Sequence, residues 1–122
     1  MSTEVFEYAL IRAVPRVERG EAINVGVILY SQAHAYLCAR IHLDEDRLRA
    51  LDPAVNVSDL RQALDAFERA CEQGPLAEQP LRARFRWLTA PRSTVVQPGP
   101  VHSGLSGDPE AELEHLLNTM VR

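Results

Sequence analysis

The sequence predicts an α+β fold, with an antiparallel sheet of three to four strands and three to four helices packed on one face of it. Two observations lead to this class. Residues 5–43 have the two-residue periodicity of strands, in three segments joined by short turns, which is typical of an antiparallel meander. From residue 44 onward, apolar residues recur at helical spacing. At a length of 122 residues, the chain is expected to form a single domain over 1–122.

The meander comprises three expected strands. The first runs over residues 5–14 and is apolar on both faces, which indicates that it is covered on both sides or nearly so. The second runs from about residue 22 to 30, and the third runs from 35 to 43. The second strand is expected to place four residues on one face: Ile23, Val25, Val27 and Leu29.

Helices follow the meander. A short helical turn contains Leu48 and stops before Pro53, and residues 60–71 have the clearest helical periodicity of the chain. The last helix begins after the capping residue Asp108, with Pro109 at its first position.

Two segments between these helices are harder to assign. Residues 80–89 fit either a helix that starts at Pro80 or an alternating strand, and the helix is favoured. Residues 93–97 are expected to form a short strand at the edge of the sheet, because Pro98 and Pro100 follow it.

The turn into the second strand holds a first group of candidate contact residues. Gly20 supplies the positive φ that a tight bend requires, and Gly26 lets a neighbouring element approach the strand closely. A half-buried amide at Asn24 needs hydrogen-bond partners. Asn24 therefore either ties down the preceding turn or forms part of a polar pocket with Arg19 and Glu21.

A second group comprises Arg92, Ser93 and Thr94, followed by His102. An arginine fork beside two hydroxyls is suited to an anion or a carboxylate, and a histidine in a loop between prolines and glycines can titrate near neutral pH. Equally, Ser93 and Thr94 can satisfy backbone groups where a helix gives way to a strand. Both interpretations remain open.

The composition argues against several activities. All 13 basic residues are arginine, so the chain lacks the lysine that P-loop enzymes, Schiff-base enzymes and protein kinases require. The net charge of −4 argues against nucleic-acid binding, even at the arginines that surround Trp87. No spacing of His, Cys, Asp or Glu matches a metal site, and we expect no cofactor.

The sequence also indicates a compartment. Cys38 and Cys71 are isolated within apolar patterns, so both are expected to be buried reduced thiols. The N-terminal residues lack the features of a signal peptide, and no apolar run approaches the roughly 20 residues that span a bilayer. We therefore expect a cytoplasmic protein that does not contact membranes.

Three segments are similar to those of a known family and lie in the same order: YALIRAVPRVERGEAINVGVILY, FRWLTAPRSTVVQPGPVHSG and DPEAELEHLLNTMV. Through them the chain resembles, over nearly its whole length, the bacterial domain of unknown function 3037 family. The resemblance implies no activity, since the family has none established. It implies a context, because genes of this family often lie beside genes for kinases that resemble the HipA toxin.

We therefore expect a non-catalytic binding or regulatory module that acts on a protein partner, and the family context implies a HipA-like kinase as that partner. The alternative is a small enzyme or an anion- or ligand-sensing domain with a polar site around Arg19, Glu21, Asn24, Arg92 and His102. The alternative requires these residues to converge in space. A protein partner instead favours an exposed apolar surface.

Overall fold

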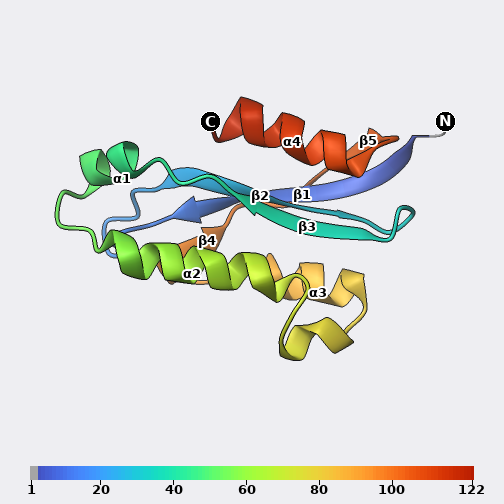
Figure 1. Ribbon diagram of the computed structural model, residues 1–122, viewed down its shortest axis with the longest axis horizontal. Coiled ribbons are helices and arrows are strands. Elements are labelled where there is room, and N and C mark those ends of the chain that lie inside the picture. The colour runs from blue at the N-terminus through green and yellow to red at the C-terminus, as the bar shows by residue number, and fades with distance from the viewer. Residues whose placement is uncertain (1–2) are drawn as a thin grey trace.

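A computed structural model describes residues 3–122 as an antiparallel sheet of five strands with helices on both of its faces (Figure 1). The α+β class and the antiparallel sheet are thus confirmed. The elements in chain order are β1 (Glu4–Ala13), β2 (Ile23–Ser31), β3 (Tyr36–Ile41), α1 (Glu45–Leu51), α2 (Val57–Ala70), the 3₁₀ helix η1 (Pro75–Glu78), α3 (Leu81–Leu88), β4 (Val96–Pro98), β5 (His102–Ser106) and α4 (Pro109–Met120).

The strand order is β3-β2-β1-β4, and β5 also pairs with β1. Strand β1 is long enough to hold two partners end to end on one edge. Its C-terminal half pairs with β4, where Ile11 lies opposite Pro98, and its N-terminal half pairs with β5, where Tyr8 lies opposite His102. The predicted count of three to four strands is therefore too low, because β5 had been expected to be a loop.

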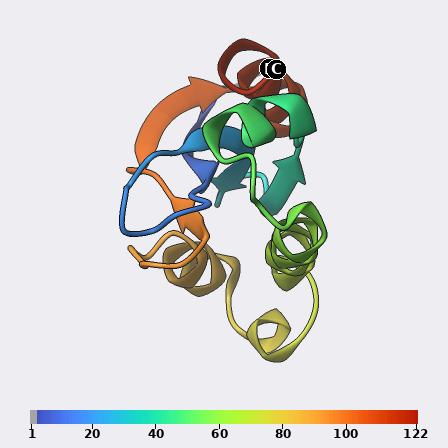
Figure 2. The same cartoon turned by 90° about the vertical axis from the view of Figure 1, so that its left-hand side faces the viewer.

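Helices cover both faces of the sheet, as Figure 2 shows in the view along the strands. Helices α2 and α3 pack on one face, and α4 packs on the other. The expectation that all helices share one face is wrong. Phe6 of β1 and Leu29 of β2 point away from α2, and they are buried against Leu113 and Leu117 of α4. From Ala9 to Ala13 the first strand is covered on both sides, as its two apolar faces predicted, whereas Val5 at its beginning is exposed.

A β-bulge in β2 divides its apolar residues between the two faces. Ile11 pairs with Gly26 and Arg12 pairs with Asn24, so Val25 is an extra residue in the ladder. Val25 consequently packs with α2, whereas Val27 and Leu29 pack with α4. The prediction that Ile23, Val25, Val27 and Leu29 share one face is wrong for this reason.

Gly26 and Gly20 have the roles that the sequence predicted. A Cβ atom at Gly26 would lie 2.7 Å from the carbonyl oxygen of Arg40 and 2.7 Å from Cδ1 of Ile41, so β3 approaches this position closely. Gly20 has a φ of 70°, in the left-handed region that the turn between β1 and β2 requires.

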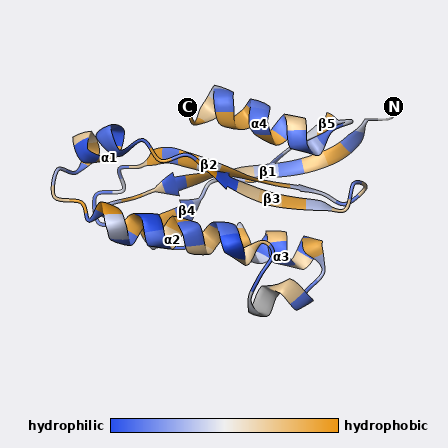
Figure 3. Ribbon diagram, in the orientation of Figure 1, coloured by the Kyte–Doolittle hydropathy of each residue, from blue (hydrophilic) through white to orange (hydrophobic). Residues whose placement is uncertain are grey.

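The helices begin at side chains that accept hydrogen bonds from their first turns. Asp44 caps α1, Asn56 caps α2, and Asp108 caps α4. Residues 80–89 contain α3, which confirms the favoured helix, and its Phe85 stacks on Tyr30 with ring centroids 5.4 Å apart. Figure 3 shows hydrophobic residues along the central strands and alternating classes along the helices. No helix within residues 3–122 is long and apolar enough to span a membrane.

Candidate functional site

The first group of predicted contact residues separates in the structure. Nε of Arg19 donates a hydrogen bond to Glu21 at 2.5 Å, and both side chains are exposed in the turn. Nδ2 of Asn24 instead donates to the carbonyl oxygen of Met120 at 3.2 Å. Nη1 of Arg47 donates to the carbonyl of Val121 at 3.0 Å. Asn24 therefore caps the C-terminal end of α4, and it neither ties down its own turn nor joins Arg19.

Arg92 performs a similar role at the end of α3. Its Nη2 donates to the carbonyl oxygens of Trp87 at 2.8 Å and Leu88 at 3.4 Å. Its guanidinium carbon lies 5.0 Å from the centroid of the Trp87 ring and 5.9 Å from that of Phe67. These contacts occupy the planar fork that an anion would otherwise use.

The remaining candidates have local roles or none that is evident. Oγ1 of Thr94 donates to the carbonyl of Val96 at 2.7 Å, which supports the interpretation that it satisfies the backbone where β4 begins. Ser93 is exposed. His102 lies in β5 rather than in a loop, and its exposed ring lies 5.4 Å from the ring of Tyr8.

The two predicted groups do not converge. Asn24 faces α4, whereas Arg92 contacts Phe67 on the opposite side of the sheet. Of the seven candidates, all within the described residues, Arg19 and Glu21 are the one pair with a side-chain interaction between them. Among residues 3–122, no group of three or more His, Cys, Asp or Glu is placed to hold a metal ion.

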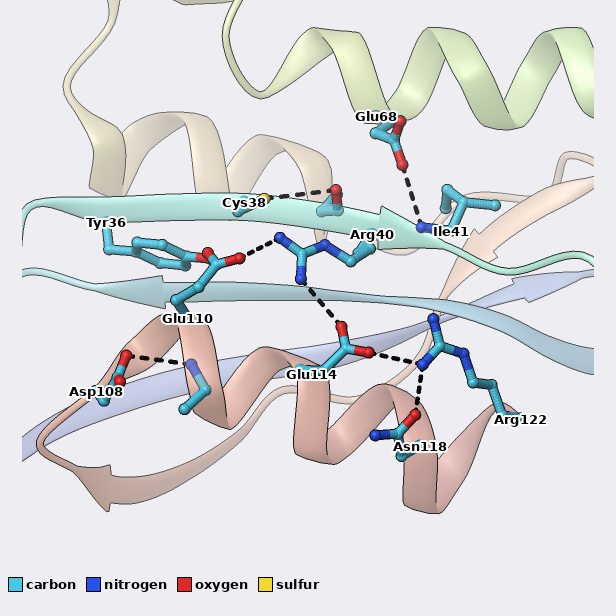
Figure 4. A network of polar contacts seen from close by, with 12 residues as sticks. Tyr36, Cys38, Arg40, Ile41, Glu68, Asp108, Glu110, Glu114, Asn118 and Arg122 are labelled. Atoms are coloured by element: carbon cyan, nitrogen blue, oxygen red, sulfur yellow. Dashed lines mark hydrogen bonds and ion pairs between the residues drawn. The ribbon is translucent and has the colours of Figure 1, made fainter.

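The densest polar cluster joins β3 to α4 and was not foreseen (Figure 4). The hydroxyl of Tyr36 donates to Glu110, and Arg40 donates to both Glu110 and Glu114, to the latter at 3.1 Å. Arg122 donates to Glu114 at 2.6 Å. The sequence signal was the i, i+4 spacing of the two glutamates, together with the alternation of Tyr36 and Arg40 along their strand.

The charges in this cluster stabilise one another. The hydrogen bond from Tyr36, followed by that from Arg40, lowers the pKa of Glu110 below its usual 4.5. The hydrogen bonds from Arg122 and Arg40 lower the pKa of Glu114 in the same way. Burial, together with the bond to Glu110, raises the pKa of Tyr36, so its hydroxyl remains a donor. The cluster fastens α4 to β3.

A groove of about 380 Å³ lies between the outer edge of β3 and α2, and both cysteines line it. Both are free thiols; Cys71 is buried as predicted, whereas Cys38 is only half-buried. Burial raises the pKa of Cys71 to about 12 and also raises that of Cys38. The thiolate is the reactive form of cysteine, so neither residue is set up as a nucleophile at neutral pH.

An exposed apolar pair lies on the other edge of the sheet. Val5 of β1 and Leu105 of β5 are direct cross-strand partners, and they are 57% and 65% exposed. Beside them a cavity of about 420 Å³ is lined by Glu4, Val5, Glu7, Tyr30, Gln32, Ala33 and Arg82. Leu105 is not among the predicted contact residues, because the segment around His102 was expected to be a loop.

The comparisons with known proteins give a family and no activity. A family model described as "Protein of unknown function (DUF3037)" matches residues 8–121, nearly the whole chain. No curated protein and no solved structure matches the chain.

Proposed function

Since the chain belongs to the DUF3037 family, whose description names no activity, we propose a function from the geometry: a non-catalytic binding module that acts on a protein partner. The observation that carries the proposal is the exposed pair of Val5 and Leu105 on adjacent strands. Single exposed apolar residues are common, whereas contiguous apolar patches are what mark contact surfaces, and Val5 and Leu105 are adjacent across two paired strands.

We name the recognition surface the β1–β5 surface and define it by Val5 and Glu7 of β1 and Ser103 and Leu105 of β5. The packing of neighbouring residues shows which face of the sheet this surface belongs to. Phe6 is buried against α4, and a Cβ atom at Gly104 would meet the Phe6 ring at 2.7 Å. Because side chains alternate along a strand, the four residues of the surface point to the face that carries α2 and α3. Arg82 of α3 borders it across the adjoining cavity.

The apolar pair supplies a driving force for association. Covering a valine or a leucine side chain completely is worth roughly 1.5–3 kcal/mol each. Val5 and Leu105 are more than half exposed in the free chain, so much of that free energy is still available to a partner. The sheet beneath them is held by the β1–β2 and β1–β5 ladders, which means that binding need not order the surface first.

The family context supplies the class of partner to test, a HipA-like kinase, because genes of this family often lie beside genes for such kinases. We place the pair in the cytoplasm. The net charge of −4 supports a protein partner rather than a nucleic acid. The alternative, a small enzyme or ligand-sensing domain, gains no support from the geometry, because Asn24 and Arg92 serve helix ends on opposite faces.

The test is a calorimetric titration of the purified chain with that kinase. We expect saturable binding that Leu105→Glu weakens at least tenfold, since a charge would then be buried against apolar partner atoms. Val17→Glu is the matched control, because Val17 is also an exposed apolar residue but lies in the turn at the far end of β1. Absence of binding, or equal losses in both variants, would remove the proposal.

A further inference from the structure

The two edges of the sheet differ in how their backbone groups are satisfied. At the β3 edge, the N–H of Ile41 donates to Glu68 of α2 at 3.1 Å, and Cys71, just after α2, lines the same groove as Ala39. Helix α2 thus lies along that edge and satisfies one of its backbone groups. At the opposite edge, β5 pairs with β1 alone among residues 3–122.

The outward-facing groups of β5 can be identified from the ladder. The N–H of Gly99 donates to the carbonyl of Leu10, so the backbone groups of Leu10 point toward the β4–β5 side of β1. By alternation, those of Phe6 and Tyr8 point the same way and bond to Gly104 and His102, which lie opposite them. The intervening residues, Ser103 and Leu105, therefore direct their N–H and C=O groups away from the sheet.

This edge also lacks the usual protection against pairing. Natural edge strands carry charges or prolines, or are covered by other elements. Residues 99–107 contain no Arg, Lys, Asp or Glu, and β5 itself contains no proline. Its Leu105 side chain is 65% exposed. Among residues 3–122, no strand pairs with the outer side of β5, whereas α2 lies along the outer side of β3.

We propose that the outer edge of β5 binds an extended segment of the partner protein as a sixth strand, through the backbone groups of Ser103 and Leu105. This inference rests on the proposed function and specifies how the partner is held. The segment is about five residues long, to match β5. It is uncharged, like the strand it joins, and carries apolar side chains at alternate positions beside Leu105.

The size of the edge favours a partner segment over a second copy of this chain. A five-residue strand is about 17 Å long. Two copies joined through β5 alone would bury far less than the roughly 1,600 Å² of a standard stable interface. A segment of another protein has further contacts available on the β1–β5 surface, which is continuous with this edge through Ser103 and Leu105.

The critical variant is Ser103→Pro, with Ser103→Ala as its matched control. Proline removes the outward N–H at this position and is tolerated on an edge strand where the N–H faces solvent. Alanine removes the hydroxyl and keeps the N–H. Since the N–H of Ser103 does not bond to β1, we expect both variants to remain folded, which a thermal unfolding curve checks. If Ser103→Pro unfolds, amide exchange in the wild type decides the question alone.

The probe is a phage-displayed library of random twelve-residue peptides, selected on the immobilised chain. We expect the selected peptides to contain an uncharged stretch with alternating apolar residues and to slow hydrogen exchange at the amides of Ser103 and Leu105. Their affinity should fall at least tenfold for Ser103→Pro and change less than twofold for Ser103→Ala. The proposal is overturned by a failure to select peptides, by peptides that leave both amides unprotected, or by equal affinity for the two variants.

Two further measurements distinguish a failure of this inference from a failure of the proposed function. If the kinase binds wild type and Ser103→Pro equally, the proposed function stands and strand addition falls. If the selected peptides protect the β5 amides while no kinase binds, strand addition stands and the kinase partner falls. A dimer in sedimentation that Ser103→Pro dissociates would assign the edge to a second copy and overturn the partner segment.

Discussion

The carbonyl oxygens at the C-terminal ends of α3 and α4 are satisfied by side chains from other segments. The last four carbonyls of a helix have no partner within the helix, and a buried one left unpaired costs roughly 1–3 kcal/mol. Arg92 supplies donors at the end of α3, and Asn24 supplies one at the end of α4. Both residues contribute to stability and are unavailable as ligand contacts in this arrangement.

Asn24→Leu tests this role of the amide. We expect it to lower the free energy of unfolding by about 1 kcal/mol, the usual net value of a hydrogen bond. Val27→Ala should lower it by roughly 1–3 kcal/mol, because Val27 is fully buried against α4 and truncation leaves a cavity. Urea titrations measure both, and Gln62→Leu on the exposed side of α2 is the control. An unchanged stability for Asn24→Leu would show that its bond to Met120 contributes nothing.

For single residues, the sequence predicts that a side chain requires hydrogen bonds more reliably than it predicts which atoms accept them. That a half-buried amide at Asn24 requires hydrogen bonds follows from its position in a strand. That its acceptor is the carbonyl of Met120, 96 residues away, follows only from where α4 packs. In the same way, the sequence shows that Arg92 can donate several hydrogen bonds. That it donates to the carbonyls at the end of α3 depends on the path of the chain after that helix.

At the scale of elements, the attachment of α4 combines an apolar and a polar layer. Leu113 and Leu117 are buried beneath the helix, and the cluster of Tyr36, Arg40 and Glu114 fastens its flank to β3. The polar layer depends on ionised carboxylates. The attachment should therefore weaken in acid.

The pH dependence of stability has a definite direction. The folded pKa values of Glu110 and Glu114 lie below 4.5, their usual value in the unfolded chain. Their contribution is complete above pH 4.5 and is lost as the pH falls through the lower folded values, because the unfolded chain then binds more protons. We expect Glu110→Gln to show a smaller loss of unfolding free energy than wild type between pH 5 and about pH 3.

Urea titrations across that pH range measure this difference. Glu78→Gln, in η1 outside the cluster, is the matched control and should follow the wild-type curve. If the free energy of unfolding falls equally steeply with decreasing pH in Glu110→Gln and in wild type, the ionised carboxylate of Glu110 does not contribute to stability in this way.

The elements themselves were predictable to different extents. Strands β1 to β3 and helices α2 and α4 follow from periodicity and from caps such as Asp108. Strand β5 was not predicted because its sequence lacks the usual alternation of apolar and polar residues. The residue on the buried side is Gly104, which lies against the Phe6 ring, and the apolar residue Leu105 is on the exposed side. The second helical layer was signalled by the two apolar faces of β1, but the bulge at Val25 hid the corresponding signal in β2.

At the scale of the whole molecule, the two edges of the sheet are unequal. Helix α2 lies along the β3 edge and accepts a hydrogen bond from Ile41 there, and the opposite edge carries the exposed pair of Val5 and Leu105. None of the seven residues predicted from sequence lies on the β1–β5 surface itself; His102 is in β5, but its ring packs against the ring of Tyr8 at a tilt of 35°. The candidates predicted from the sequence are all polar or charged, whereas the most distinctive feature of this surface is its apolar pair, Val5 and Leu105.

The central claim is that a protein partner binds this chain at the β1–β5 surface. The most direct test is a map of amide and methyl chemical-shift changes in the labelled chain as the HipA-like kinase is added. The account predicts changes at Val5, Glu7, Ser103 and Leu105, with no changes in the turn around Arg19. Changes concentrated at Arg19 and Glu21 or around Arg92, or no changes at saturating kinase, would contradict it.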